Sequence, residues 1–125
     1  MKVSIALALF LAVSAYAHDA HGKSHAPAAA KTLKSPLTAA QAKPELGKAK
    51  FEEVCAACHG ENGKGAVKTK PAPTDLTDHK MHSMKDGEIY WVITNGIGKS
   101  MPGFKAQMSD TERWQIVLYV RQLAK

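Results

Sequence analysis

The most constraining feature of this sequence is the pentapeptide Cys55-Ala56-Ala57-Cys58-His59. Two cysteines three positions apart, followed directly by a histidine, form the covalent attachment pattern of a c-type haem. On a helix the three side chains share one face, so the two thiols can bond the porphyrin vinyl groups while the imidazole reaches the iron. The sequence therefore predicts one covalently attached haem c, with Cys55 and Cys58 as its thioether residues and His59 as an axial ligand of the iron.

A pair of cysteines at this spacing is also found in disulfides, in redox pairs and in zinc sites. The sequence contains only two cysteines, which excludes a zinc site with four thiolates. A thioredoxin-like pair would lie at the start of a helix after a strand, whereas this pair comes at the end of a helical pattern. Haem attachment is therefore the favoured interpretation.

Residues 1–17 have the organisation of a secretory signal peptide. Lys2 precedes an apolar stretch over residues 3–13, and Ala15-Tyr16-Ala17 is a small-x-small cleavage site. The segment is shorter than the about 20 residues that span a bilayer, although an uncleaved anchor is the alternative. We expect cleavage before His18, no permanent membrane span in the mature protein, and a periplasmic location, which agrees with haem attachment outside the cytoplasm.

Residues 18–43 are rich in Ala, Lys, Pro and His and contain few large apolar side chains. Such a segment cannot bury enough surface to offset the entropy lost on ordering, so it is predicted to be a flexible tail. Its histidines, His18, His21 and His25, are expected to be solvated rather than metal-bound. The predicted domain, residues 44–125, is small enough that a cofactor should contribute much of its stability.

The charge of the chain argues against a nucleic-acid partner. The formal net charge is +6, but part of it comes from Lys2 in the leader and part from the lysines of residues 18–43. The remaining domain is only mildly basic and has no stretch in which aromatic and basic residues alternate. No nucleic acid is expected to bind.

Helical periodicity without any alternating strand pattern predicts an all-α domain of about three main helices. The first is predicted from Pro44 to about Cys58, because proline suits the first helical position and Glu45 favours the helix dipole. Gly47 and Phe51 lie on its apolar face. A glycine inside a helix suggests the close approach of another helix.

The second and third helices have their own boundary signals. The second is predicted from about Met84 to Asn95, with Ser83 and Asp86 in capping-box spacing and Gly96 as the stop. The aromatic residues on it, Tyr90 and Trp91, are expected in the core rather than against the haem. The third helix is predicted to start at Ser109, which forms a capping box with Glu112.

The loop after His59 contains three glycines and ends in Pro71-Ala72-Pro73. A ligating histidine commonly donates its second ring N–H to a backbone carbonyl. We expect that carbonyl to lie near Pro71 or Pro73, and the sequence does not choose between them.

A haem iron that only transfers electrons needs a sixth ligand. The downstream candidates are Met81, Met84, Met101, Met108, His79 and His82. Met101 is favoured because it lies in a loop between helices and is followed by Pro102, which stiffens the backbone. Met84 and Met108 lie at helix starts, where methionine more often packs in a core.

The chain resembles the class I c-type cytochromes, specifically the small soluble bacterial proteins with one haem. The resemblance rests on Cys55-Ala56-Ala57-Cys58-His59-Gly60, on the proline-containing loop after it, and on Met101-Pro102 before a C-terminal helix. It covers residues 44–125 and leaves residues 18–43 without a counterpart. It implies the cytochrome c fold, in which helices and loops wrap around one covalently bound haem.

The resemblance also implies a specific helix contact. In that family, a glycine and an aromatic residue on the first helix pack against an aliphatic and an aromatic residue on the last. Here Gly47 and Phe51 would meet Ile116 and Tyr119. This contact would explain the glycine inside the first helix.

The function expected from these residues is electron transport in the periplasm by a monomeric carrier with His59 and Met101 as iron ligands. Its partners would be redox proteins of the periplasmic respiratory chain. Lysines near the haem edge would steer them, namely Lys64, Lys68, Lys70, Lys99 and Lys105. The alternatives are a small peroxidase or gas-binding sensor with a labile sixth ligand, and a dedicated haem subunit of a larger oxidoreductase.

Overall fold

The computed structural model describes residues 25–124, so the predicted leader and cleavage site lie outside the described residues. It contains two 3₁₀ helices and four α-helices, in the order η1 (Ala28–Thr32), α1 (Pro44–Val54), α2 (Ala56–His59), η2 (His79–Ser83), α3 (Asp86–Asn95) and α4 (Asp110–Leu123). Extended pairing in this part of the chain is limited to one bridge between Ile97 and Met101. No helix between residues 25 and 124 has both the length and the apolar character needed to cross a bilayer. The predicted all-α class is confirmed.

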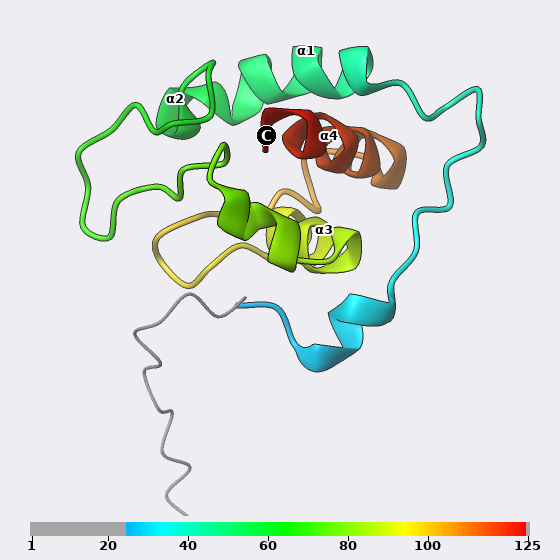
Figure 1. The fold of residues 1–125 in the computed structure, drawn as a ribbon, viewed down its shortest axis with the longest axis horizontal. Coiled ribbons are helices and arrows are strands. Elements are labelled where there is room, and N and C mark those ends of the chain that lie inside the picture. Colours follow the sequence, from blue (N-terminus) through cyan, green and yellow to red (C-terminus); the bar gives the residue numbers. More distant parts are fainter. Residues whose placement is uncertain (1–24, 125) are drawn as a thin grey trace, which may run out of the picture.

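The helix predicted over residues 44–58 is divided at Cys55. α1 ends at Val54 and α2 begins at Ala56, so Cys55 alone separates the two helices (Figure 1). Hydrogen bonds continue through the junction, because Cys55 N donates to Phe51 O at 2.7 Å and His59 N donates to Cys55 O at 2.9 Å. The short helix α2 therefore carries both Cys58 and His59.

α1 and α4 cross at a glycine. A Cβ atom at Gly47 would lie 2.0 Å from the carbonyl oxygen of Gln115 and 3.0 Å from the nitrogen of Ile116. One turn later, Phe51 is 1% exposed and meets Tyr119 edge-on, with 5.2 Å between the ring centroids. The predicted contact of Gly47 and Phe51 with α4 is confirmed, and the packing reason for the glycine is the backbone of α4.

α3 begins two residues later than predicted. Ser83 belongs to η2, where its hydroxyl donates to Lys80 O at 2.7 Å, so it does not cap α3. Glu88 takes that role, because its buried carboxylate accepts a hydrogen bond of 2.7 Å from Lys85 N. The helix ends at Asn95 as predicted. Of the two aromatic residues expected in the core, Tyr90 is half-buried at its edge, stacked on Trp114 with 4.2 Å between the ring centroids, whereas Trp91 is half-buried and does not belong to the core cluster.

α4 begins as the sequence predicts. The hydroxyl of Ser109 accepts from Glu112 N at 3.3 Å, and Ser109 N donates to the Glu112 carboxylate at 2.8 Å. Nearly every side chain between Arg113 and Val120 is buried, because this helix contacts both α1 and α3. α4 is therefore the central element of the fold.

The segment that precedes α1, residues 25–43, is here called the arm. It follows the surface from η1, which packs on α3, round to the start of α1 (Figure 1). Ala30 is 2% exposed, and the arm backbone lies so close to α3 that a Cβ atom at Gly87 would come within 2.1 Å of Ala30 O. At its other end, the amide of Gln115 donates to Gln41 O at 2.8 Å.

The expectation of a flexible tail is therefore wrong for residues 25–43, whereas residues 18–24 lie outside the described part. The composition argument assumed that ordering requires large apolar side chains. Here the small side chain of Ala30 and the absent one of Gly87 let two backbones touch, so packing is gained from close approach instead. His25 is exposed, as expected.

Candidate haem-binding site

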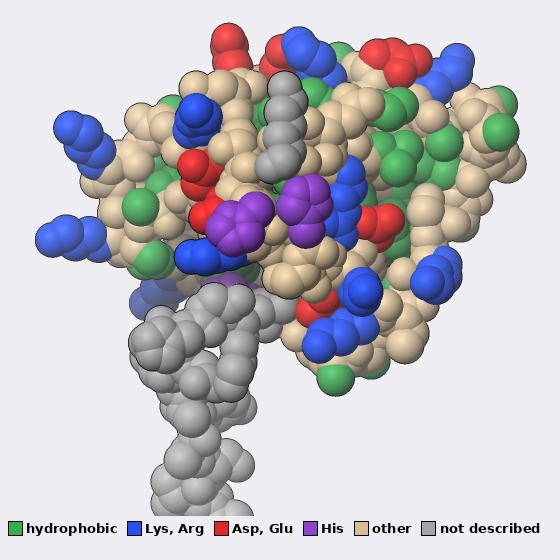
Figure 2. Space-filling view, in the orientation of Figure 1, with side chains coloured by type: hydrophobic (Ala, Val, Ile, Leu, Met, Phe, Trp, Pro, Cys, Tyr) green, Lys and Arg blue, Asp and Glu red, His purple; other side chains and the backbone are tan. Residues whose placement is uncertain are grey.

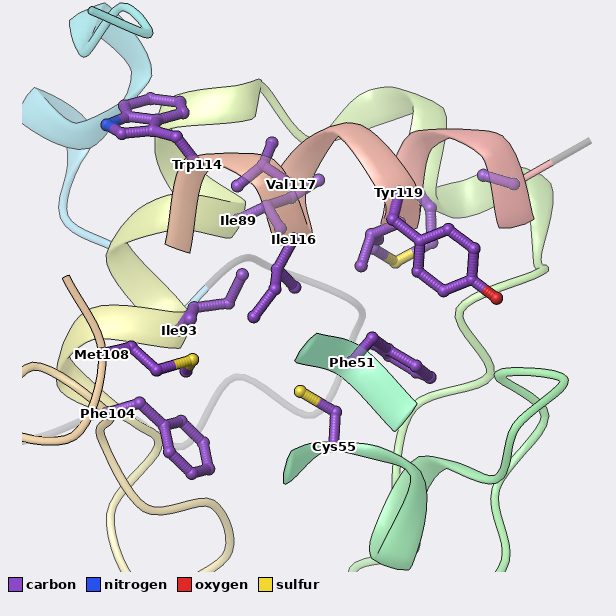
Figure 3. Packing of buried hydrophobic residues seen from close by; sticks show 13 residues of the cluster. Phe51, Cys55, Ile89, Ile93, Phe104, Met108, Trp114, Ile116, Val117 and Tyr119 are labelled. Carbon is purple, nitrogen blue, oxygen red and sulfur yellow. The ribbon is translucent and has the colours of Figure 1, made fainter. Parts of the chain in front are cut away.

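The two cysteines of the attachment motif differ in their surroundings. Both are free thiols, and Cys55 is buried whereas Cys58 is exposed. Figure 3 shows the sulfur of Cys55 pointing into the hydrophobic cluster, between Phe104 and Met108 on one side and Phe51 on the other. One thiol thus faces the interior and the other faces outward, one helical turn apart.

The electrostatics of Cys55 oppose a role in disulfide exchange. Burial, with a smaller contribution from the neighbouring Cys58, raises the pKa of the Cys55 thiol to about 11. Reactive cysteines in redox pairs have a lowered pKa, because the thiolate is the nucleophile. The apolar surroundings suit a thiol that is bonded to a hydrophobic group, so the redox-pair alternative is disfavoured.

His59 is oriented by a backbone carbonyl. Its Nδ1 lies 3.4 Å from Thr74 O, which leaves Nε2 as the nitrogen that can reach a metal. Burial lowers the pKa of His59, and the interaction with the Thr74 carbonyl opposes part of that change. The neutral imidazole is the form that binds iron. The accepting residue, Thr74, directly follows Pro73, so the structure selects the second of the two expected regions.

The glycine-rich loop closes back onto α2 through its backbone. Gly65 N donates to His59 O at 2.6 Å, and Ala66 N donates to Cys58 O at 2.8 Å. Further along, Leu76 N donates to Gly63 O at 2.8 Å. These bonds hold the loop that presents Thr74, so the orientation of His59 depends on the path of the whole loop.

Met101 is held by its own backbone. Ile97 N donates to Met101 O at 2.8 Å, and Met101 N donates back to Ile97 O at 3.2 Å. Gly96 makes this turn possible, because its φ is 76° and a Cβ atom there would lie 2.3 Å from Met101 O. The Met101 side chain is half-buried against the same hydrophobic cluster that contains Cys55.

The other candidates for the sixth ligand are placed differently. Met81 and Met108 are each 5% exposed and belong to the core. His79 and His82 are exposed, and His79 lies 3.1 Å from the carboxylate of Asp78. Met84 and Met101 both lie outside the helices and are partly buried against the cluster, so Met101 stays the favoured candidate because Pro102 follows it.

The residues present fit a covalently held haem. Cys55 and Cys58 are unpaired, His59 is neutral and oriented, and the cluster beside them is apolar. His59 borders that cluster too, since its ring lies 6.4 Å from the ring of Phe51. Sequence reasoning placed the carbonyl that orients His59 near Pro71 or Pro73 without naming Thr74, and it missed Gly96 as a support of Met101, for which the Asn-Gly pair at the end of α3 was a signal.

Comparison with known proteins gives a family and two groups of relatives. Residues 42–120 match the family described as Cytochrome C oxidase, cbb3-type, subunit III. The chain is 32% identical over 82 residues to the cbb3-type cytochrome c oxidase subunit CcoP of Azospirillum brasilense, covering 63% of this chain and 28% of that protein. It is 39% identical over 83 residues to cytochrome c6 of Synechocystis sp., covering 63% of this chain and 64% of that protein.

Solved structures share the fold. Cytochrome cL of Methylophaga aminisulfidivorans aligns with a TM-score of 0.57 and 22% identity, over 70% of this chain and 56% of that one. Cytochrome cL of Hyphomicrobium denitrificans aligns with the same TM-score and 18% identity, over 80% of this chain and 64% of that one. These alignments confirm the cytochrome c fold.

Proposed function

Because the chain belongs to the family of cytochrome c oxidase, cbb3-type, subunit III, we propose that it is an electron carrier with His59 and Met101 as the axial ligands of one haem c. Membership confirms the resemblance to class I c-type cytochromes and makes covalently attached haem, with its iron, the cofactor. The observation that carries the proposal is that His59, oriented by Thr74, and Met101 border one apolar cluster.

When bound, the haem supplies a one-electron iron couple, and the chain performs no bond chemistry. Cys55 and Cys58 hold the group, and Thr74 fixes the tautomer of His59. A methionine ligand at position 101 raises the reduction potential. The buried side chains around Cys55, namely Phe51, Phe104 and Met108, keep water from the interior face.

The ligand assignment is tested by substituting Met101 with alanine in the haem-loaded protein. A methionine–iron bond has a weak charge-transfer band in the far red of the oxidised protein, and we expect Met101→Ala to abolish it and to lower the reduction potential. Met108→Leu and Met84→Leu are matched controls that should keep the band. Loss of the band in either control instead would overturn the assignment to Met101.

The same variant separates electron transfer from enzymatic alternatives. A peroxidase or gas-binding sensor needs an iron position that opens readily. We expect the wild-type protein to be inert toward carbon monoxide, and Met101→Ala to bind it. Rapid binding of carbon monoxide by the wild-type protein would favour a sensor or a peroxidase.

We infer a periplasmic location, reached through the signal peptide at residues 1–17, and collision with acidic redox partners. The lysines proposed to steer them, Lys64, Lys68, Lys70, Lys99 and Lys105, are all exposed. Steering makes the rate of electron transfer fall as ionic strength rises. A rate that is independent of salt would rule steering out.

A second candidate is a haem subunit of a larger oxidoreductase. It is favoured by the subunits CcoP and FixP among the relatives, although the chain spans only about a quarter of their length. A carrier migrates as a monomer in native electrophoresis of a periplasmic extract. Co-migration with a complex would favour the subunit.

A further inference from the structure

An open cleft lies where the arm meets the junction between η2 and α3. Its volume is about 360 Å³, and it is lined by residues of the arm, of this junction and of α4. Its charged lining residues are Lys31, Lys34, Lys85, Asp86 and Arg121. None of the four predicted haem residues lines it. In Figure 1, η1 lies on the side of α3 that faces away from α1 and α2.

The charges of the cleft are not balanced. Arg121 is committed to the fold, because its guanidinium donates to Asp86 at 2.6 Å, to Met81 O at 2.7 Å and to Met84 O. Asp86, the only carboxylate in the lining, is thereby neutralised. The three lysines of the lining are exposed, and none of them forms an ion pair within residues 25–124.

The arm supplies two of these three lysines. Lys31 lies in η1 and Lys34 follows it, while Lys85 faces them from the residue before α3. The contact between Ala30 and Gly87 holds the two sides of the cleft together. Figure 2 shows Lys and Arg side chains over the region of η1, with histidine side chains nearby. The three lysines therefore lie together only while the arm is packed on α3.

The cleft also offers an apolar contact. Leu33 is 41% exposed, one of two large hydrophobic side chains that the described residues leave in solvent, and it lines the cleft. Met84 lines it from the opposite side. An open cleft with separate ammonium groups and an exposed leucine fits an extended chain that carries several carboxylates and an apolar side chain.

We propose that this cleft is a docking surface for an acidic segment of a partner protein, separate from the haem edge. Lys31, Lys34 and Lys85 pair with the carboxylates of the segment, and Leu33 contacts its apolar side chain. The haem edge stays free while the segment is bound. A partner held here remains near the haem at a raised effective concentration, so electron exchange no longer depends on collision alone.

The test uses the haem-loaded mature protein and a fluorescein-labelled peptide of glutamates interrupted by leucines. Binding is followed by fluorescence anisotropy at an ionic strength of about 0.1 M, where charges more than about 10 Å apart are largely screened. K31E/K34E should weaken binding about 10-fold or more, because two attractions become repulsions. K43E/K48E, at the start of α1 and outside the cleft, changes the net charge equally and should weaken binding less than about 3-fold.

The variants are checked first by their haem absorption spectra and thermal midpoints, which exposed substitutions should leave unchanged. Equal weakening by both double variants would overturn the proposal, because binding would then follow net charge alone. Absence of binding to the wild-type protein would overturn it as well. Pyrophosphate that binds as tightly as the peptide and displaces it would identify a small-anion site in place of a docking surface.

Discussion

Two glycines bring backbones into contact in this molecule, and they belong to regions of different kinds. Gly47 meets the carbonyl of Gln115, at a crossing of two helices within the haem domain. Gly87 meets the carbonyl of Ala30, where the arm lies on α3. A side chain at either position would overlap its neighbour by a similar amount, since the distances are 2.0 and 2.1 Å.

The two contacts differ in whether the element that meets the glycine can move away from it. At Gly47 both partners are central helices that also contact the remaining core, so a clash cannot be relieved without disturbing the cluster around Phe51. At Gly87 one partner is a surface segment, which can leave while the domain stays folded. Similar local geometry therefore predicts unequal consequences.

The largest effect is expected for Gly47→Ala. We expect a loss of about 3 kcal/mol in the free energy of unfolding, because an added methyl group would overlap the backbone of α4. The measurement is guanidinium-induced unfolding of the haem-loaded protein. Gly98→Ala is the control, since Gly98 has φ 48° but open space around it, and strain alone costs about 1–2 kcal/mol. A cost no greater than the control's would refute the crossing as described.

Gly87→Ala should cost less, about 1–2 kcal/mol, because release of the arm limits the penalty to the free energy of its docking. If the arm is released in this variant, proteases should cleave within residues 25–43 while the haem domain remains intact. Limited proteolysis followed by mass spectrometry detects this. If Gly87→Ala cost as much as Gly47→Ala, the arm would have to be counted as part of the core.

Gln115→Ala should be milder still. It removes the hydrogen bond of 2.8 Å to Gln41 O but leaves the backbone that Gly47 contacts, so a loss of about 1 kcal/mol is expected. Hydrogen exchange should quicken in the second half of the arm and remain unchanged in α1. Faster exchange throughout α1 would show that Gln115 supports the helix crossing as well.

The smallest loss of stability is expected for a substitution of Asp110, on the side of α4 that contacts α3. Asp110 accepts hydrogen bonds from Tyr90 and from Arg113, which lower the pKa of its carboxyl group. A lowered pKa stabilises the fold above the ordinary value of 3.8 and ceases to do so as the pH falls through the folded-state value. Asp110→Asn should therefore cost about 0.5 kcal/mol at pH 7, a small amount because the carboxylate is largely exposed and screened by solvent.

The pH dependence is the decisive part of that experiment. The difference in unfolding free energy between wild type and Asp110→Asn should shrink as the pH falls below 3.8. Chemical denaturation at a series of pH values measures it. A difference that stays constant with pH would mean that the carboxylate contributes no stabilising charge.

The haem domain and the arm also differ in how well the sequence predicted their structure. Ser109 and Glu112 marked the start of α4 through local hydrogen bonds, and the attachment motif together with Met101-Pro102 marked the candidate site through its chemistry. The order of the arm was not predicted because it depends on a contact between Ala30 and Gly87, neither of which has a large apolar side chain. The carbonyl that orients His59 could be predicted only to the region of Pro71 or Pro73, since a backbone carbonyl leaves no trace in residue type.

The position of α4 has a consequence for how the chain is made. Gln115 bonds Gln41 across 74 residues of sequence, and α1 and α3 both pack on this one helix. The ribosome must complete α4 before the surfaces of α1 and α3 that pack on it can be buried, so the core cannot form in step with synthesis. The faces of α1 and α3 that α4 covers therefore stay open until α4 has been synthesised, and the core closes in one late step.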